Sequence, residues 1–210
     1  MTSFVNTIHA KTILIATHNK KKRSEIKEIL KDDSWLLLRG PEDFPFMPEV
    51  EEDGTTFQEN AIKKATTLAK ACNTWAMADD SGLEIDALNG RPGVYSCRYA
   101  GPHATDEKNI EKVLSELSGV PKERRTARFV CTIALAGPDE LFFVVEGCCE
   151  GFITEGPKGK YGFGYDPIFY VSDYRQTFAE LNPAIKNKIS HRASALKQFR
   201  ERIQPLVRRI

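Results

Sequence analysis

The stretch WAMADDSG, residues 75–82, places two adjacent carboxylates where an apolar run meets a glycine. Residues 76–78 predict a short buried strand, and residues 83–87 alternate between apolar and polar types, as a hairpin arm does before the Asn89-Gly90 turn. Neighbouring carboxylates repel one another unless a cation lies between them, and hard oxygen ligands select Mg²⁺ or Mn²⁺ over zinc. The stretch therefore predicts a strand that ends in a metal site or a proton acceptor. A solvated loop or a helix cap is the alternative for each carboxylate.

Upstream of this stretch, residues 12–17 form another apolar run, which predicts a strand, and helical spacing follows in residues 20–30. The turn between them holds His18-Asn19, and four cations crowd positions 20–23. Backbone N–H groups at a helix start lack partners and carry partial positive charge, so the turn suits a phosphate, to which Lys22 could add a full charge. A plain basic helix face is the alternative, because the spacing GxxxxGK[ST] is absent.

The rest of the chain mixes helices with hairpins. Thr56-Phe57-Gln58-Glu59 reads as a capping box and predicts a second helix after a proline-containing loop, 39–54, that ends in acidic residues. Residues 91–101 are too rich in glycine for a helix. The further predicted elements are a helix capped by Thr105 or Asp106, strands over 126–136 and 141–149 continued by Phe152 and Ile153, a strand over 168–171 and a helix over 185–207. This mixture predicts one α/β domain, residues 1–210, with a long mixed sheet bent around a cleft.

Composition argues against several classes of function. The 210 residues carry 30 basic and 29 acidic side chains, a net charge of +1, which disfavours nucleic-acid binding through the cations at 20–23. No apolar run approaches the ~18 residues that a membrane span needs, and residues 1–12 lack the pattern of a signal peptide. The five cysteines have neither CxxC nor zinc spacing, so we expect free thiols in a cytoplasmic protein.

Two downstream motifs carry aromatic and cationic groups. In GFGYDP, residues 162–167, glycines on both sides of Phe163 would let a flat ring approach the backbone, and stacking of an aromatic ring on a base contributes ~1–3 kcal/mol. Core aromatics in a glycine-rich hairpin are the alternative. In KNKISHR, residues 186–192, His191 and Arg192 stand near two lysines, a donor set suited to phosphate or carbonyl oxygens. A solvated helix start would have the same composition.

Taken in order, these motifs resemble the inosine-triphosphate pyrophosphatase family, which acts on non-canonical purine nucleoside triphosphates. The resemblance covers about residues 13 to 196, and the ordered set is highly specific. It rests on ATHN (16–19) with Lys22, FQENA (57–61), ADDSGL (78–83), PGVYS (92–96), GFGYDP (162–167) and SHR (190–192). His18 stands where the family usually has glycine, which predicts a less common backbone conformation at that turn, and about ten residues precede the family's usual start.

The resemblance implies specific roles for residues of this chain. Asp80 would accept the proton of the attacking water, and Glu51 and Asp80 would coordinate Mg²⁺. The triphosphate would be held by Thr17, Asn19, Lys22 and Lys64, and Ser81 would contact substrate. The base pocket and its phosphate-side wall would consist of Phe163, Gly164, Tyr165, Asp166, Lys186, His191 and Arg192. Family members have two lobes around a long central sheet and are usually homodimers, so a homodimer is expected here.

The implied reaction is attack of water on the α-phosphorus of ITP, dITP or XTP, which yields a nucleoside monophosphate and pyrophosphate. Three rival functions are a nucleotide sensor without catalysis, an enzyme that releases orthophosphate from the γ position, and a nucleic-acid binder that uses residues 20–23. The sensor is disfavoured because the sequence retains both Asp80 and Lys22.

Overall fold

The computed structural model describes residues 11–207, and its centre is one seven-stranded mixed sheet in the order β2-β1-β3-β4-β5-β6-β7. β1 pairs in parallel with β2 and β3, and the remaining pairs are antiparallel. The strands are β1 Lys11–Ile15, β2 Leu36–Arg39, β3 Trp75–Ile85, β4 Thr126–Ala136, β5 Leu141–Ile153, β6 Phe169–Val171 and β7 Gln176–Thr177. The predicted α/β class with a long mixed sheet is confirmed.

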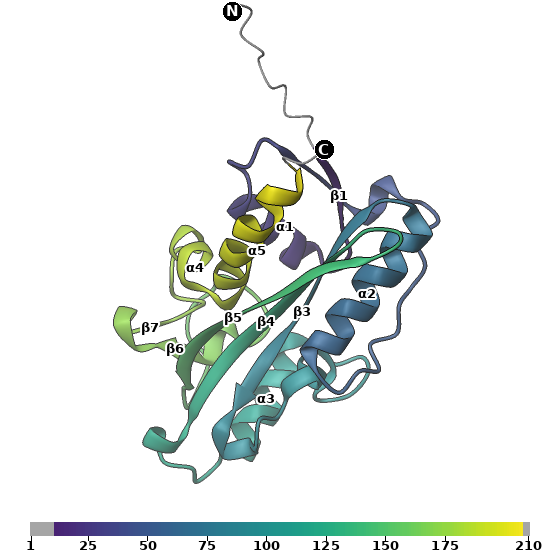
Figure 1. Cartoon of the computed structure of the whole chain (residues 1–210). Helices are drawn as coiled ribbons and strands as arrows, with labels where there is room; N and C mark the ends of the chain where they lie inside the picture. Colours follow the sequence, from purple (N-terminus) through teal and green to yellow (C-terminus); the bar gives the residue numbers. More distant parts are fainter. Residues whose placement is uncertain (1–10, 208–210) are drawn as a thin grey trace, which may run out of the picture.

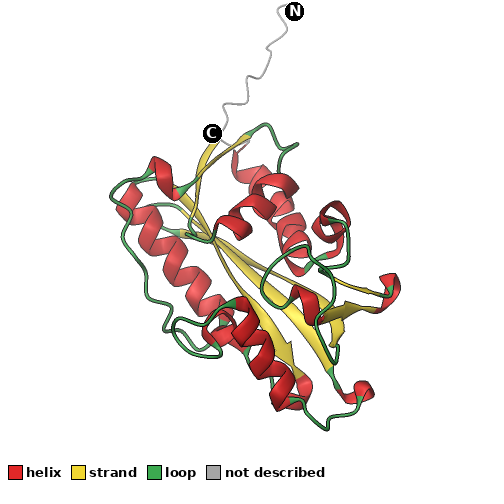
Figure 2. Ribbon diagram, turned by 180° about the vertical axis from the view of Figure 1, so that it is seen from behind, coloured by secondary structure: helices red, strands yellow, loops and turns green. Residues whose placement is uncertain are grey.

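Helices cover both faces of the long strands. They are α1 Lys20–Ile29, α2 Phe57–Cys72, α3 Asp106–Glu116, α4 Pro183–Ile189 and α5 His191–Val207. Figure 1 shows α2 along one side of β3–β5 and α1, α4 and α5 on the other, and the view from behind in Figure 2 shows the same division. No helix within residues 11–207 combines the length and the apolar character that a membrane crossing requires.

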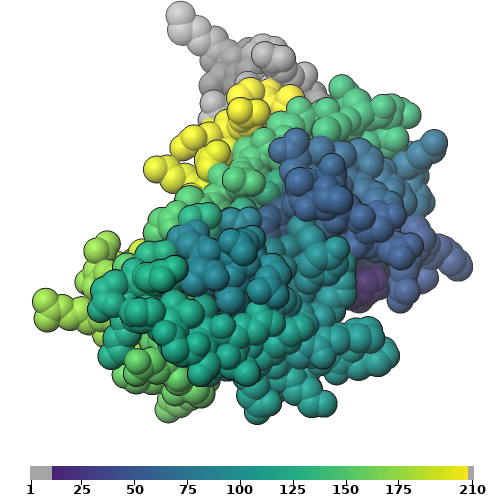
Figure 3. Space-filling model, turned by 90° about the horizontal axis from the view of Figure 1, so that it is seen from below, coloured from purple at the N-terminus to yellow at the C-terminus, as the bar shows by residue number. Residues whose placement is uncertain are grey.

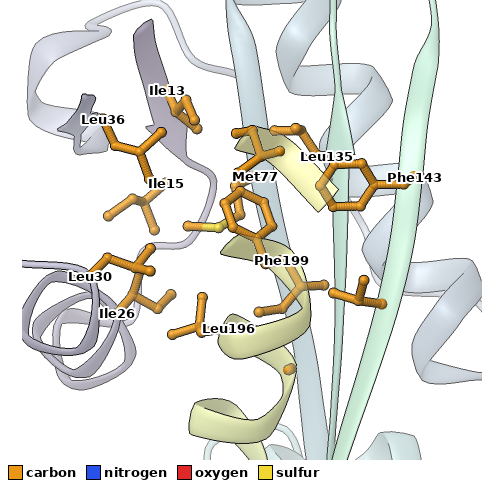
Figure 4. Close-up of a cluster of buried hydrophobic side chains, with 14 of the residues drawn as sticks. Ile13, Ile15, Ile26, Leu30, Leu36, Met77, Leu135, Phe143, Leu196 and Phe199 are labelled. Atoms are coloured by element: carbon orange, nitrogen blue, oxygen red, sulfur yellow. The ribbon is translucent and has the colours of Figure 1, made fainter. Parts of the chain in front are cut away.

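The pleat of β3 sends its side chains alternately to these two helical layers. Trp75 and Met77 pack with α1 and α5, in the cluster that Figure 4 shows around Phe199. Ala76 and Ala78 pack with the alanine-rich face of α2. Since successive residues of a strand point to opposite faces, this short apolar run contributes to two cores at once.

The cluster around Phe199 is called the first cluster below. Further along the same strand, Leu83 and Ile85 belong to another cluster, called the second cluster and distinct from the one against α2, which also contains Val113 and Leu117 of the α3 region. β4 follows the same plan, with Ile133 in the first cluster and Phe129 in the second. The polar part of β3 therefore lies between two apolar cores on one continuous strand.

The structure revises three local predictions. Residues 75–85 form one strand, not a short strand followed by a separate arm, because Gly82 stays in the ladder opposite Val130. A Cβ at Gly82 would lie 2.4 Å from Ser96 Oγ, so this glycine permits a close approach of the neighbouring segment and does not turn the chain. Residues 93–98, predicted as non-helical, form a 3₁₀ helix.

The predicted C-terminal helix is divided in two at Ser190. The Ser190 hydroxyl accepts the backbone N–H of Ala193 at 3.2 Å, as a cap does at the start of α5. The five cysteines are free, as predicted. The prediction that the chain lacks a signal peptide concerns residues 1–12, of which residues 1–10 lie outside the described part of the chain.

Candidate active site

A cavity of about 350 Å³ lies between the first and the second core cluster. In Figure 3, atoms from the N-terminal part of the described chain (purple) are recessed between blue and teal segments. Every residue predicted for the site except Glu51 lines it. These are Thr17, Asn19, Lys22, Lys64, Asp80, Ser81, Phe163, Gly164, Tyr165, Asp166, Lys186, His191 and Arg192. Motifs separated by more than a hundred residues thus meet at one place, while their individual roles stay predictions.

The two adjacent carboxylates of β3 point to opposite faces of the sheet. Asp79 lies on the side of α1 and α5, where its Oδ2 is 3.1 Å from Lys22 Nζ and 3.2 Å from an Arg192 guanidinium nitrogen. Asp80 lies on the side of α2, where Asn60 Nδ2 donates to Asp80 Oδ2 at 3.1 Å. The interpretation that one cation lies between Asp79 and Asp80 is therefore wrong, because a pleated strand alternates its side chains.

Asp79 is the anionic centre of a buried ion-pair network. Burial by itself would raise the pKa of this carboxyl, but Lys22, Arg192 and Lys64 outweigh burial and hold the pKa well below its usual range. Its Oδ1 has no hydrogen-bond partner within the described residues. Asp79 therefore stays ionised and orients two cations at the cavity.

Oxygen atoms of Asp80, Glu52 and the main chain lie around the ammonium group of Lys64. Lys64 Nζ lies 2.7 Å from Glu52 Oε1, 2.7 Å from the carbonyl oxygen of Asp79 and 3.5 Å from Asp80 Oδ1. Such a set of hard oxygens suits Mg²⁺ or Mn²⁺. Residues 11–207 contain no group of three His, Cys, Asp or Glu side chains that could hold a metal, so a metal here would take its other ligands from substrate and water.

The environment of Asp80 differs from that of its neighbour. Burial raises the pKa of the Asp80 carboxyl, and this effect exceeds the opposing effect of Lys64 and Lys22. A carboxylate with a raised pKa holds a transferred proton more readily than an ordinary one. This environment is compatible with the predicted role of Asp80 as proton acceptor, which stays a prediction.

Glu52, and not Glu51, faces the cavity. Val50 and Glu52 line it, whereas Glu51 and Asp53 are exposed. Asn60 Oδ1 accepts the N–H of Gly54 at 2.8 Å, which ties the end of this segment to the residue that also contacts Asp80. The position of Glu51 does not support its predicted pairing with Asp80. One feature of the sequence could have indicated this orientation. Residues two apart in an extended segment point to the same side, so Glu52 is expected to face inward together with the apolar Val50.

The cationic turn is capped by its own side chain. Asn19 Oδ1 accepts the backbone N–H groups of Lys21 and Lys22 at 3.0 and 3.1 Å, so it is the N-cap of α1. His18 is exposed and does not have a positive φ, so the predicted unusual conformation at this position is wrong. Because the cap engages two of the backbone donors, the turn's contribution to the cavity rests on Lys22, the one of its four cations that lines the cavity.

The opposite wall is a glycine loop that presents Phe163. Gly162 and Gly164 have φ values of 75° and 58°, and a Cβ at Gly162 would lie 1.9 Å from Asp166 Oδ2. The N–H of Phe163 donates to that same oxygen at 2.8 Å. Lys186 Nζ lies 4.8 Å from the centre of the Phe163 ring. The glycines permit a tight loop that brings the ring to the cavity.

Glu25 of α1 pairs with two cations, Lys186 and Arg192, and was not among the residues predicted for the site. Glu25 accepts from Lys186 Nζ at 2.9 Å and from the guanidinium of Arg192. Lys186 also donates to Asp166 at 2.5 Å. The signal that could have found Glu25 is its spacing of three from Lys22, which places both on one face of the helix.

His191 is buried and neutral. Its ring stacks on Phe129 at 4.7 Å between centroids, with 15° between the planes. Burial, with Arg192 and Lys186 nearby, holds the pKa of His191 well below its ordinary value. Its Nδ1 has no partner within the described part of the chain. A neutral imidazole has one donor and one acceptor nitrogen, so one of these two capacities is buried at Nδ1 without a partner among the described residues.

One cavity lined by cations, carboxylates and an aromatic ring defines an α/β protein built to bind a nucleoside phosphate. Residues 13–202 match the model of the Ham1 family, and the chain belongs to this family. It is 56% identical over 189 residues to the dITP/XTP pyrophosphatase of Bacillus subtilis, covering 90% of this chain and 95% of that protein. The predicted family resemblance is thereby confirmed.

Solved structures agree with this assignment. The Ham1 protein of Staphylococcus aureus superposes with a TM-score of 0.83 at 44% identity, covering 93% of this chain and 100% of that one. A HAM1 protein from Coxiella burnetii has a TM-score of 0.82 at 46% identity, covering 90% and 96%.

Proposed function

We propose that this chain hydrolyses the non-canonical purine nucleoside triphosphates ITP, dITP and XTP to the nucleoside monophosphate and pyrophosphate, which removes them from the nucleotide pool. The observation that carries the proposal is that one cavity holds the carboxylate of Asp80, the cations Lys22 and Lys64, and the ring of Phe163. The name of the Bacillus subtilis relative, a dITP/XTP pyrophosphatase, supports the same substrate class.

In this reaction Asp80 orients a water molecule and takes its proton as the water oxygen attacks the α-phosphorus. The bond between that phosphorus and the oxygen bridging to the β-phosphate breaks, and pyrophosphate leaves with the bonding pair. Lys22 and Lys64 stabilise the negative charge of the departing group. Mg²⁺ at the oxygens of Glu52 and Asp80 would neutralise part of the triphosphate charge. We assign to Glu52 the role that the resemblance suggested for Glu51.

The wall around Phe163 selects the base. The ring stacks on the purine, and the buried donors of Lys186 and Arg192 match the 6-oxo acceptor of hypoxanthine and xanthine. Adenine would present a 6-amino donor to these donors, and each buried polar group left unpaired costs about 1–3 kcal/mol, which disfavours ATP. For the other predicted residues that line the cavity, we propose the substrate contacts that the resemblance implies; they are Thr17, Asn19, Ser81, Gly164, Tyr165, Asp166 and His191.

A nucleotide panel with separate readouts for pyrophosphate and orthophosphate tests the proposal. With Mg²⁺ present, we expect ITP, dITP and XTP to release pyrophosphate and the monophosphate, and ATP and GTP to react far more slowly. Asp80→Asn should remove turnover while thermal unfolding shows an intact fold. Release of orthophosphate with a diphosphate product would favour the γ-phosphatase, and tight binding of ITP without turnover would favour the sensor.

We further propose that the chain acts as a cytoplasmic homodimer, which the family resemblance supports. Light scattering coupled to size-exclusion chromatography should give twice the chain mass of 23.6 kDa, and a mass of one chain would contradict the dimer.

A further inference from the structure

We propose that Asp106 is a positioning residue. By accepting the backbone N–H of Gly164, it holds the neighbouring ring of Phe163 in the position from which the ring stacks on a base. This inference rests on the proposed function of Phe163 as the stacking residue. Asp106 was a candidate cap for α3, but Thr105 is the cap, because its hydroxyl accepts the N–H of Lys108. The Asp106 carboxylate is therefore free for another use, and it lines the cavity.

Asp106 joins segments that lie far apart in the sequence. Its Oδ2 accepts the N–H of Gly164 at 2.8 Å, across 58 positions of the chain. The same oxygen lies 3.5 Å from Lys21 Nζ of α1. A hydrogen bond from a backbone N–H to a carboxylate is shorter and stronger than one between neutral groups. Asp106 thus connects α3, the glycine loop and α1 at one side of the cavity.

The backbone at Gly164 has open space on its Cβ side, so no side chain packs against it there. Nothing lies within 4 Å of where a Cβ of Gly164 would stand, and its φ is 58°. The consecutive N–H groups of Phe163 and Gly164 donate to two carboxylates, Asp166 within the loop and Asp106 outside it. Asp106 is therefore the partner outside the loop for these two N–H groups, beside the hydroxyl of Tyr165, which donates to the carbonyl oxygen of Ser96 at 2.8 Å and ties the next residue.

The helix that carries Asp106 is itself firmly placed. Asn109, one turn later and buried, accepts the N–H of Ala100 at 2.8 Å and donates to the carbonyl oxygen of Cys97 at 3.2 Å. Asp106 is also the first residue of α3, where the positive end of the helix dipole stabilises an anion. A fixed carboxylate can position a loop, whereas one on a mobile segment could not.

The ion pair between Lys21 and Asp106 contributes little by comparison. Their side chains are 60% and 45% exposed, and pairs of that kind have small effects in water. The hydrogen bond and the ion pair can therefore be separated by substitution. Asp106→Asn keeps an oxygen acceptor for Gly164 and removes the charge, Lys21→Met removes the ion pair alone, and Asp106→Ala removes both.

Steady-state kinetics with ITP and binding of two ligands test the inference. For Asp106→Ala we expect KM to rise about tenfold with kcat changed less than about threefold, because the base is misplaced and the phosphate chemistry is intact. Asp106→Asn and Lys21→Met should stay within about twofold of the unsubstituted protein. By calorimetry, Asp106→Ala should weaken IMP binding similarly and leave binding of inorganic tripolyphosphate, which has no base, unchanged.

Several results would overturn the inference. Unchanged KM and IMP affinity in Asp106→Ala would show that the loop holds Phe163 without this contact. Equal weakening of tripolyphosphate would show a general effect on the cavity, as would a lower thermal midpoint for Asp106→Ala alone. Loss of IMP affinity in Lys21→Met would assign the effect to the ion pair. If the unsubstituted protein binds IMP but hydrolyses no nucleotide, the proposed function fails while the binding comparison still tests Asp106.

Discussion

At the scale of single residues, Asp79 and Asp80 show how one position along a strand changes the chemistry of a side chain. Asp79 faces Lys22 and Arg192, which keep its pKa well below the usual range. Asp80 faces α2, where burial raises its pKa. The same residue type is therefore an ion-pair centre on one face and, in the proposed reaction, the proton acceptor on the other.

The segment before α2 permits a matched comparison of two adjacent glutamates. Glu52→Gln should lower kcat/KM by at least about a hundredfold and raise the Mg²⁺ concentration needed for half-maximal activity, because one of two carboxylates at the cation position is lost. Glu51→Gln should stay within about twofold, since Glu51 is exposed and does not line the cavity. Titration of bound Mn²⁺ by paramagnetic resonance checks the affinity directly. A larger effect from Glu51→Gln would restore the pairing of Glu51 with Asp80.

His191 makes stability depend on pH in a defined direction. Its pKa in the folded protein is lowered, mainly by burial, so between that value and about 6.5 the unfolded chain binds the additional proton. The free energy of unfolding should therefore fall as pH drops below about 6.5, with a contribution of up to ~1.4 kcal/mol per pH unit. Urea unfolding at pH 7.5 and 5.5 measures this slope.

His191→Gln should make that slope shallower by the same amount, whatever its effect on stability at neutral pH. His103→Gln is the matched control, because His103 is exposed whereas His191 is buried. Identical slopes in the unsubstituted protein and His191→Gln would contradict a neutral buried imidazole.

At the scale of elements, β5 and α5 approach so closely that a side chain cannot fit between them. A Cβ at Gly147 would lie 2.3 Å from the backbone nitrogen of Ala195 and 2.5 Å from the carbonyl oxygen of His191. Both neighbours are backbone atoms of α5, which cannot move without moving the helix. Because α5 begins with His191 and Arg192, this packing also fixes where these two residues lie at the cavity.

Gly147→Ala should therefore destabilise the protein by about 1–3 kcal/mol, since α5 must shift away from the sheet. Gly156→Ala is the matched control, because nothing lies within 4 Å of a Cβ there, and its effect should stay within about 0.5 kcal/mol. Urea unfolding gives both values. Equal stability of the two variants would mean that the helix and the strand are less tightly packed than the structure has them.

At the scale of the whole molecule, the site lies between two apolar cores that share their strands. β3 and β4 each contribute residues to both clusters. Ions paired across α1, β3, α4 and α5 fill the space between them, through Glu25, Asp79, Lys186 and Arg192. Continuous strands oppose independent movement of the two halves, so we propose that the chain unfolds as one domain.

Truncating a side chain in one cluster and following unfolding at the other cluster tests whether the chain unfolds as one domain. The two tryptophans, Trp35 and Trp75, both belong to the first cluster or pack against it. Leu117→Ala removes a fully buried side chain of the second cluster and should cost about 2–5 kcal/mol. If the clusters unfold together, tryptophan fluorescence should report the whole loss. Leu141→Ala, at a site 39% exposed, should have a much smaller effect, and an unchanged tryptophan transition in Leu117→Ala would contradict a single unit.

The sequence by itself determined the type of most elements. Local signals suffice for these, because apolar periodicity and the capping box at Thr56 act over a few residues, and glycines mark the loop that carries Phe163. The ordered motifs then identified the family, which brought distant segments together without any knowledge of their contacts.

Only the tertiary structure decided which way the side chains point and what they contact. It turned Asp79 and Asp80 to opposite faces, turned Glu52 inward instead of Glu51, and brought Asp106 to the N–H of Gly164. The physical reason is that a local pattern gives the alternation of a strand or an extended segment but not which side will be buried. That choice depends on helices packed from elsewhere in the chain, and it fixes the electrostatic environment of every group in the site.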